Sequence, residues 1–418
     1  MDGPFLWTKD HQGFLLTAFF WGYIISQIPG ALIGTIYGPK YTVLFAILIS
    51  GICAACYKVA AFVSIKLIWF LRVIVGLCTG MILPCASQLW TNWAPVQERS
   101  FLISFAVSGS HLGSVVTLPI GGILCVKGLD GGWPTLFYLI ASACGIWCVA
   151  WFFLFSDNPS KHPFISSKEK NYILKNTNIS KSKISIKQVP WKAILLNRAL
   201  HANIICHTFL HWGLYTLLTS IPNYFKDVLH LDIKSNGGLS AIPYLCMWFF
   251  TTVSGIMSDF LIHKNCISRT WARKLSNLTG SIPVAICLIL LTKVKKDQIT
   301  LAIALLAISQ GFYGVAFGSG YMVIPNDIAG QYAGIAFGIS NTFGTIPGLI
   351  SPYLTGFMTR NKSQKEWTNV FIVSAVMYII AGVVFTIFGT SELQDFARST
   401  EDTRNLDELE PMAKLPNT

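Results

Sequence analysis

The chain has 418 residues, of which 53% are hydrophobic and 12% are charged, and it carries a formal net charge of +12. A water-soluble domain usually has about 25% charged residues, so this composition excludes an ordinary soluble globular protein. Together with a mean hydropathy of +0.54, it indicates a polytopic membrane protein.

Eleven stretches are long and apolar enough to cross a bilayer, which takes roughly 20 mostly apolar residues. One long polar segment, residues 157–198, separates the first five from the last six. We therefore predict an all-α protein with a helix bundle at 1–156, a central loop at 157–198, a second bundle at 199–390 and an acidic, disordered tail at 391–418. The predicted spans are 13–36, 42–62, 65–90, 101–126, 133–156, 199–225, 237–262, 275–293, 299–325, 330–358 and 368–390.

Lysine and arginine are distributed unequally between the two sides of these spans. One side carries 18 of them and the other carries 12. Because cytoplasmic loops are enriched in basic residues, the 157–198 loop and the C-terminus are expected in the cytoplasm. The positive charge is thus interpreted as a topology signal rather than as a nucleic-acid-binding surface. The cysteines are scattered singly, mostly inside apolar runs, so we expect neither a disulfide framework nor a metal site, and no cofactor.

The sequence repeats itself in parallel. "GGWPTLFYLIASACG" near Trp133 is similar to "EWTNVFIVSAVMYIIAG" near Trp367, and the surroundings of Gly113 are similar to those of Gly344, with offsets of about 230 residues. The second half then has six spans and the first has five, so a further helix is expected before Met1. Two six-helix halves joined by a long cytoplasmic loop are typical of the major facilitator fold, in which the halves rock about a central site.

Several longer stretches resemble one family within that superfamily. They include "FFWGYIISQIPGALIG" from Phe19, "WTNWAPVQERS" from Trp90, "HWGLYTLLTSIPNYFKDVLH" from His211 and "GISNTFGTIPGLISP" from Gly338. This is the anion–cation symporter family of sodium–phosphate cotransporters, urate and organic-anion transporters, sialin and vesicular glutamate transporters. The resemblance implies a secondary active transporter of small anions in a lipid bilayer, and not an enzyme.

Arg72 lies inside an apolar span, on a predicted helix face with Gly76 and Thr79. A charge within the bilayer costs at least about 2.5–3.5 kcal/mol, so such a residue is usually paired or faces a cavity. The alternative is snorkelling, because Arg72 follows Lys66 by six residues, or about 9 Å of helix. The resemblance favours a role for Arg72 in binding anionic substrate, since a guanidinium can hold a carboxylate or phosphate through two hydrogen bonds.

The departures from the family pattern also bear on function. Sialin-like members place acidic residues where this chain has Val75 and Thr79, and glutamate transporters have an arginine where it has Leu210. The resemblance therefore favours a carrier of phosphate, urate or organic anions in the plasma membrane, driven by sodium or by the membrane potential. The alternatives are a lysosomal proton-coupled exporter of sialic acid or acidic sugars, and a truncated isoform that does not transport. The oligomeric state stays open.

Five further polar residues lie within predicted spans, and four of them complete the candidate substrate-binding set. His207 and His211 are one helical turn apart, but a metal site is not expected because no third ligand is in view. Of the two, the family pattern favours His207. His111 has small neighbours, and Tyr215 and Asn341 lie on helices expected at the interface of the halves. The competing interpretation for each is a hydrogen-bonded packing residue.

A candidate gate lies at the predicted cytoplasmic side. Asp259, in "SGIMSDFLIHK", resembles the second copy of the superfamily's gating motif, whose aspartate holds one conformation. The first copy is degenerate, because Thr35 and Ile36 stand at its aspartate and arginine. Glu98 and Arg99 are expected to contribute to the same gate.

One sequon is predicted to be glycosylated. Asn361 begins "NKS" in a loop expected on the outer side, whereas "NIS" at Asn178 lies on the expected cytoplasmic side. We therefore expect glycosylation at Asn361 and not at Asn178.

Overall fold

The computed structural model describes residues 9–177, 189–230, 239 and 241–398, and every regular element within them is helical. The elements of the helix bundles, which include the short α15 and η3, are α1 (Lys9–Tyr37), α2 (Pro39–Val63), α3 (Ile65–Gly80), α4 (Ile82–Trp93), α5 (Arg99–Lys127), α6 (Pro134–Leu154), α9 (Arg198–Asp227), α11 (Ala241–His263), α12 (Arg269–Thr279), α13 (Ile282–Leu291), α14 (Ile299–Ser319), α15 (Ile324–Ala329), η3 (Gly330–Tyr332), α16 (Ala333–Met358) and α17 (Gln364–Phe388).

The helices confirm the prediction of an all-α polytopic membrane protein. Within the described residues, ten stretches are long and apolar enough to cross a membrane, and the longest, Ile299–Met358, contains both α14 and α16. Helices therefore lie in each of the eleven predicted spans, although residues 237, 238 and 240 of the span 237–262 lie outside the described residues. Two spans are divided, because α3 ends at Gly80 before α4, and α12 ends before Gly280 and α13. In both cases a proline, Pro84 or Pro283, lies in the first turn of the second helix. A backbone N–H at that position would have no acceptor within the helix, so a proline there removes no helical hydrogen bond.

The turn between α1 and α2 depends on a glycine and a carboxylate. Gly38 has a φ of +96°, a conformation that favours glycine, and Pro39 begins α2. The backbone N–H of Lys40 donates to Asp157 Oδ1 at 2.6 Å, which places a carboxylate at the amino end of α2. Burial raises the pKa of Asp157 above its usual range. The end of α6 is thereby tied to the start of α2.

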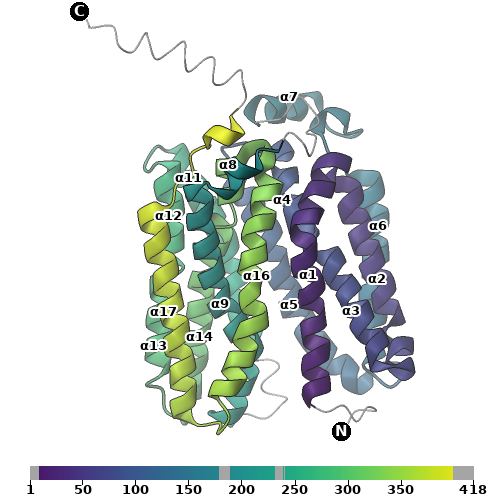
Figure 1. Ribbon diagram of the computed structural model, residues 1–418, viewed down its shortest axis with the longest axis vertical. Helices are drawn as coiled ribbons and strands as arrows, with labels where there is room; N and C mark the ends of the chain where they lie inside the picture. The colour runs from purple at the N-terminus through teal and green to yellow at the C-terminus, as the bar shows by residue number, and fades with distance from the viewer. Residues whose placement is uncertain (1–8, 178–188, 231–238, 240, 399–418) are drawn as a thin grey trace, which may run out of the picture.

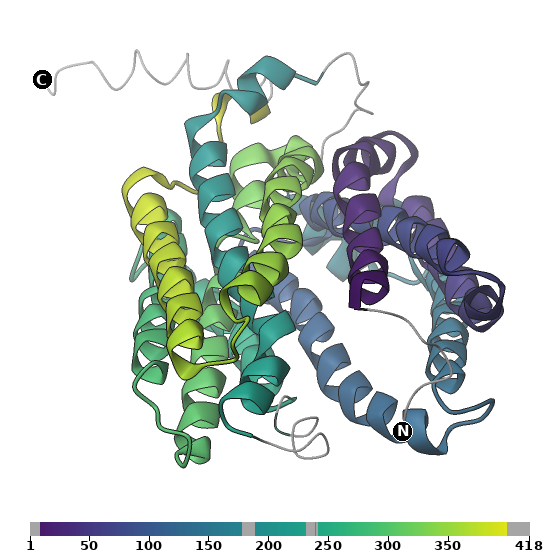
Figure 2. The same cartoon turned by 60° about the horizontal axis from the view of Figure 1, so that its bottom comes forward.

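The helices form two bundles that lie side by side, as Figure 1 shows. The N-terminal bundle comprises α1–α6 and the C-terminal bundle comprises α9–α17. The two bundles meet chiefly where α1 packs on α16 and where α5 packs on α11, with further contacts from α4 to α15 and α16. Viewed from the end in Figure 2, α5 passes diagonally from the N-terminal bundle towards the C-terminal one.

The N-terminal bundle packs through small residues. A Cβ on Gly76 of α3 would lie 2.9 Å from the backbone nitrogen of Tyr23, so α1 and α3 approach at backbone distance. On the outside, α6 exposes large apolar side chains such as Ile146 and Phe153, which are 73% and 66% exposed. A bilayer would cover this surface, since an apolar helix face is stable against lipid.

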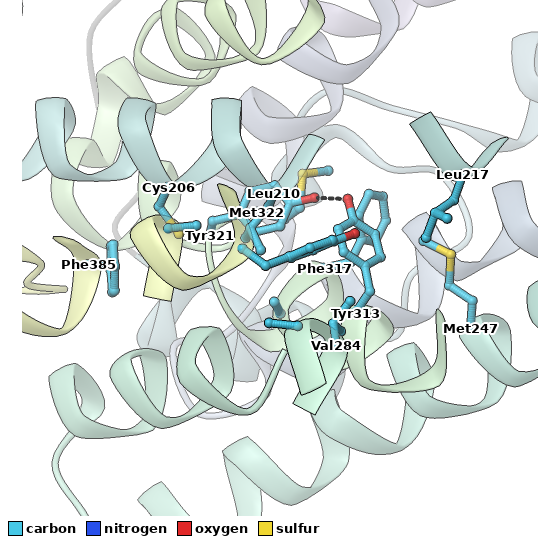
Figure 3. Packing of buried hydrophobic residues seen from close by; sticks show 14 of the residues in the cluster. Cys206, Leu210, Leu217, Met247, Val284, Tyr313, Phe317, Tyr321, Met322 and Phe385 are labelled. Atoms are coloured by element: carbon cyan, nitrogen blue, oxygen red, sulfur yellow. Dashed lines mark hydrogen bonds between the residues drawn. The ribbon is translucent and has the colours of Figure 1, made fainter. Parts of the chain in front are cut away.

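The largest buried cluster lies in the C-terminal bundle. Figure 3 shows its centre, where Tyr313, Phe317 and Tyr321 pack against Cys206 and Leu210. The hydroxyls of Tyr313 and Tyr321 are 2.8 Å apart, so these buried phenols satisfy one another. This bundle therefore has a dense core that holds polar groups within it.

Short elements cover the end of the molecule at which α7 is drawn in Figure 1. The predicted central loop contains η1 (Pro159–Lys161), α7 (Ser167–Asn176) and α8 (Trp191–Leu195). The prediction of disorder from 391 is wrong for its first residues, because η4 (Asp395–Ala397) is formed there and the backbone N–H of Gln394 donates to Ile328 O at 3.0 Å. The rest of the tail, 399–418, lies outside the described residues.

Candidate functional site

The candidate gate lies at the end of the bundles that carries α7, α8 and η4. The distribution of basic residues predicts that this end faces the cytoplasm, and it is called the cytoplasmic end below. Here the N-terminal bundle contributes α4 and the start of α5. The C-terminal bundle contributes α15, the end of α11 and the start of α12.

Asp327 of α15 is the centre of a buried ion cluster. Its Oδ2 accepts from Arg273 Nε at 2.8 Å, and its Oδ1 lies 3.5 Å from Arg99 Nη1. All three side chains are at most 4% exposed. Arg99 belongs to α5 of the N-terminal bundle, whereas Arg273 and Asp327 belong to the C-terminal bundle. One carboxylate therefore pairs with a guanidinium from each bundle, most closely with Arg273, and the cluster keeps one excess positive charge.

Arg273 extends the cluster through neutral partners. Its Nη1 donates to Ser100 Oγ at 2.8 Å, to Ser258 Oγ at 3.1 Å and to the carbonyl of Ser319 at 3.1 Å. Ser100 lies in the N-terminal bundle, so Arg273 also bridges the two bundles. Buried charges are tolerated when they are paired and hydrogen-bonded, and this guanidinium is ion-paired through Nε and hydrogen-bonded through Nη1.

Two hydrogen bonds between Ser87 and Asn326 reinforce the same junction. Ser87 Oγ of α4 donates to Asn326 Oδ1 at 2.9 Å, and Asn326 Nδ2 donates back to the carbonyl of Ser87 at 2.7 Å. Both residues are buried. The two bonds run in opposite directions between the same two residues, so they fix α4 against α15.

Asp259 and Glu98 have different surroundings. Asp259 of α11 accepts the backbone N–H groups of Ser100 at 3.2 Å and Phe101 at 2.7 Å, and so caps the amino end of α5 from the other bundle. Glu98 is exposed and accepts from Tyr172 Oη of α7 at 2.7 Å. Glu98 thus fastens the central loop to its own bundle, while Asp259 joins the two bundles.

A cavity between the bundles lies further from the cytoplasmic end. Its volume is about 420 Å³, and α5, α9 and α11 line it. The polar groups on its wall are the hydroxyls of Ser110, Ser114, Thr117 and Tyr244. The bundles are therefore held together at the cytoplasmic end and leave space between them towards the opposite end.

His207 and His211 belong to a buried polar network inside the C-terminal bundle. His207 Nδ1 lies 2.9 Å from Ser340 Oγ, while its Nε2 has no partner among the described residues. His211 Nδ1 lies 3.0 Å from the carbonyl of Gly344, and its Nε2 lies 3.1 Å from Tyr321 Oη. The two rings meet edge to face at 4.3 Å between centroids. The two histidines are thus neighbours with different partners. His207 contacts Ser340 of α16, whereas His211 contacts Gly344 of α16 and Tyr321, which follows α14.

Tyr215 and Asn341 lie where α1 meets the C-terminal bundle. Asn341 Nδ2 donates to Tyr23 Oη at 3.3 Å, across the contact between α16 and α1. The ring of Tyr215 packs edge to face on Phe20 at 5.7 Å and contacts His211 at 5.4 Å. Tyr215 therefore connects the histidine network with the surface of the N-terminal bundle.

His111 lies at a second contact between the bundles. Its ring packs on Phe317 of α14 at 4.9 Å, and its Nε2 is buried without a partner among the described residues. The preceding residue, Ser110, lines the cavity between the bundles. His111 is therefore close to this cavity, and its ring lies against the opposite bundle.

Arg72 is apart from these residues. On the same helix, Val75 and Thr79 line a cavity of about 530 Å³ within the N-terminal bundle, between α2, α3 and α6. Arg72 is partly exposed and has no ion-pair or hydrogen-bond partner in the described part of the chain. The structure thus brings together His207, His211, Tyr215 and Asn341, but not Arg72.

Sequence reasoning missed two central residues of the gate. Arg273 was counted as a loop residue, because the predicted span began at 275 and α12 begins at Arg269. Asp327 fell into the predicted break between two spans, although α15 buries it. The available signal was the polar pair Asn326–Asp327 inside the otherwise apolar segment "VIPNDIAG".

Comparisons with known proteins agree with this architecture. Residues 2–352 match the sequence profile of the Major Facilitator Superfamily. Sialin from Ovis aries is 37% identical over 94% of this chain and 78% of its own length. A putative inorganic phosphate cotransporter from Drosophila melanogaster is 33% identical over 96% and 76%. Among solved structures, the proton:xylose symporter XylE has a TM-score of 0.72 at 14% identity, covering 95% of this chain and 89% of that one. This last similarity concerns the fold.

Proposed function

Because this chain belongs to the Major Facilitator Superfamily, in the group of sialin and the inorganic phosphate cotransporters, we propose that it moves small anions across the membrane by alternating access. Its relatives are membrane transporters and not enzymes, so transport itself is the family's activity. The proposal concerns the substrate, which we take to be phosphate, urate or an organic anion, and the drive, which we take to be sodium or the membrane potential.

The observation that carries the proposal is the asymmetry between the two ends. Ion pairs and hydrogen bonds join the bundles at the cytoplasmic end, while a cavity of about 420 Å³ lined by α5, α9 and α11 lies between the bundles nearer the other end. A carrier in an outward-facing state needs this arrangement. Breaking the cytoplasmic contacts and closing the outer cavity would expose the bound anion to the cytoplasm.

Arg72 is the proposed first contact for the anion. It is the residue of the candidate substrate set with a permanent charge, and the described structure gives it no counter-ion. His111, His207, Tyr215 and Asn341 are proposed to act later, when the bundles move and alter the contacts around them. Because the neutral groups can donate and accept hydrogen bonds, they can hold an anion without trapping it.

The similarity to sialin supports a second candidate function, the proton-coupled export of sialic acid or acidic sugars. A carboxylate that gains and loses a proton within the bundle would be expected for this mechanism, but Val75 and Thr79 stand where sialin-like members have acidic residues. Asp327 does not replace them, because two arginines already neutralise it. We therefore rank this function second.

The transport proposal is tested with purified protein in proteoliposomes. We expect saturable uptake of radiolabelled phosphate or urate that depends on an imposed sodium gradient or membrane potential. Arg72→Gln should lower the uptake efficiency about tenfold to a hundredfold, because a hydrogen bond to a charged group contributes about 1.5–3 kcal/mol. Uptake of sialic acid that follows an imposed pH gradient would instead support the second candidate.

Lys66→Gln is the matched control for this experiment. It removes one positive charge from the same helix, at an exposed position six residues away. If Lys66→Gln reduced uptake as much as Arg72→Gln, the effect would reflect surface charge rather than anion binding. Wild-type uptake in the Arg72→Gln variant would remove Arg72 from the proposed site.

Asn361 provides a test of the proposed orientation. It is exposed in the turn between α16 and α17, where its Nδ2 donates to Glu366 Oε1 at 2.7 Å. We expect an N-glycosidase to increase the gel mobility of the wild-type protein from mammalian cells, and Asn361→Gln to abolish this shift. The control is Asn178→Gln, which should leave the shift unchanged. A shift that survives in Asn361→Gln but not in Asn178→Gln would reverse the orientation.

The plasma membrane is the proposed location of the carrier. Labelling of intact cells with a membrane-impermeant amine-reactive biotin should recover the glycosylated protein. Recovery only after the cells are permeabilised would favour an internal membrane, as the second candidate function requires.

A further inference from the structure

The cytoplasmic end contains a cavity of about 440 Å³, separate from the two cavities described above. It lies between the start of α5, the start of α12, α15 and the residues that follow α17. We propose that this cavity is a binding site for a phosphate group. The site is distinct from the proposed transport path, and its existence does not depend on which anion is transported. Its lining consists of Arg99, Ser268, Arg269, Thr270, Asp327, Ser391, Glu392, Leu393 and Arg398.

The charges on the wall favour an anion. Arg99, Arg269 and Arg398 contribute three guanidiniums, against the carboxylates of Asp327 and Glu392. The charge of Asp327 is already neutralised by Arg273, which lies 2.8 Å away outside the lining. Arg398 also approaches Asp395 at 3.2 Å, but that pair is exposed and contributes little. The cavity therefore retains a positive excess.

Arg99 supplies an unused donor inside the protein. Its side chain is buried, and Nη1 donates to the carbonyl of Asn326 at 3.2 Å and towards Asp327 at 3.5 Å. Its Nε has no hydrogen-bond partner among the described residues. A buried charged donor without a partner is costly, and an oxyanion in the adjoining cavity would provide the missing acceptor.

The start of α12 adds backbone donors at the same wall. Ser268 caps this eleven-residue helix by accepting the N–H of Trp271 at 3.3 Å, and Ser268, Arg269 and Thr270 all line the cavity. The amino end of a helix attracts negative charge. Arg269 in the first turn is unfavourable for the helix dipole by itself, and a bound anion would offset that repulsion.

Donors on several sides match a tetrahedral oxyanion. The guanidiniums of Arg269 and Arg398, the helix N–H groups and the hydroxyls of Thr270 and Ser391 come from two segments of the chain, the start of α12 and the residues after α17, and Arg99 adds a donor from α5. A phosphate group presents several acceptor oxygens and up to two charges, and arginine binds such groups through two parallel hydrogen bonds. A halide could not use donors from so many directions.

Ligand binding at this position would stabilise the closed gate. Arg99 belongs to the N-terminal bundle, whereas the other lining residues belong to the C-terminal bundle and the segment after it. Opening the cytoplasmic end moves Arg99 away from the rest of the site. Because a ligand that binds one state better shifts the population towards that state, a bound phosphate group would slow inward opening. The group can belong to free phosphate or to a phosphorylated lipid headgroup.

The experiment compares the full-length protein with Arg269→Gln/Arg398→Gln in nanodiscs. Neither residue belongs to the gate, and both are at least partly exposed, so the double variant should fold. Inorganic phosphate is titrated by calorimetry into discs of phosphatidylcholine, and its effect on the melting temperature is recorded. Parallel discs contain phosphatidylinositol bisphosphate without free phosphate. All titrations are repeated in the Arg72→Gln background, which removes the proposed transport site.

We expect phosphate, or the phosphorylated lipid, to bind and to raise the melting temperature, and the double variant to weaken this binding at least tenfold. The control Lys264→Gln removes an exposed charge from the neighbouring turn and should leave the affinity unchanged. If the double variant binds free phosphate more weakly than wild type does, the ligand is the soluble ion. If its binding weakens only in the discs that contain the phosphorylated lipid, the ligand is the headgroup. Equal binding by wild type and by the double variant with both probes would overturn the proposal. If the double variant did not fold, Arg269→Gln alone would serve the same comparison. If Arg72→Gln does not transport but still binds phosphate in this cavity, the phosphate site is independent of the proposed transport site.

Discussion

Asp327→Asn is expected to abolish transport and to lower the free energy of unfolding by about 3–5 kcal/mol. The substitution keeps the size of the side chain but removes the negative charge that Arg99 and Arg273 share at 3.5 Å and 2.8 Å. Two buried guanidiniums would then face each other without a counter-charge. Because charges in a water-excluded site are costly when unpaired, the bundles should separate at the cytoplasmic end and the carrier should lose its outward-facing state.

The measurement is the melting temperature of the purified variant, together with its uptake activity in proteoliposomes. Glu392→Gln is the matched control, since it neutralises an exposed carboxylate in the neighbouring cavity. Adding Arg99→Gln to Asp327→Asn should recover part of the stability, because one of the two unpaired charges is then removed. Recovery of transport is not expected, since the link between the bundles stays broken. A melting temperature equal to that of wild type would contradict the buried ion cluster.

Hydropathy predicted the helices well for a physical reason. In a bilayer the backbone must satisfy its own hydrogen bonds, so a sufficiently long apolar stretch becomes a helix. The same signal failed for residues 269–274, because it measures affinity for lipid. There Arg273 is covered by protein and paired with Asp327, so the helix extends through a segment whose composition is that of a polar loop.

The pairings across the bundles could not be predicted from local patterns. Asp327 and Arg99 are separated by 228 residues, and Ser87 and Asn326 by 239. The internal repeat predicted that two halves exist, but it does not determine which side chains meet between them. For Arg72 the sequence predicted a paired or cavity-facing side chain, because the residue lies inside an apolar span. In the structure Arg72 is partly exposed and is not among the residues that line the cavities described above.

Cross-linking Ser87→Cys to Asn326→Cys is expected to abolish transport. In the closed arrangement the Asn326 side chain accepts from the Ser87 hydroxyl at 2.9 Å and donates to the Ser87 backbone carbonyl at 2.7 Å, so thiols at the two positions are close enough for a disulfide or a short thiol-specific linker. The bond would join α4 to α15 and hold the cytoplasmic end closed. Alternating access requires these helices to separate, so the carrier should stop in its outward-facing state.

Uptake into proteoliposomes is measured before oxidation, after oxidation and after reduction of the double variant. We expect nearly complete loss on oxidation and full recovery with a reducing agent, whereas each single cysteine variant should be unaffected by oxidant. The single variants also control for Cys85, a buried native thiol on α4 whose Sγ lies against the carbonyl of Gly30. Because the bond constrains only this contact, undiminished uptake by the fully cross-linked protein would show that the contact between α4 and α15 does not open during transport. The ion cluster around Asp327 would then be a structural support of the fold rather than part of a gate.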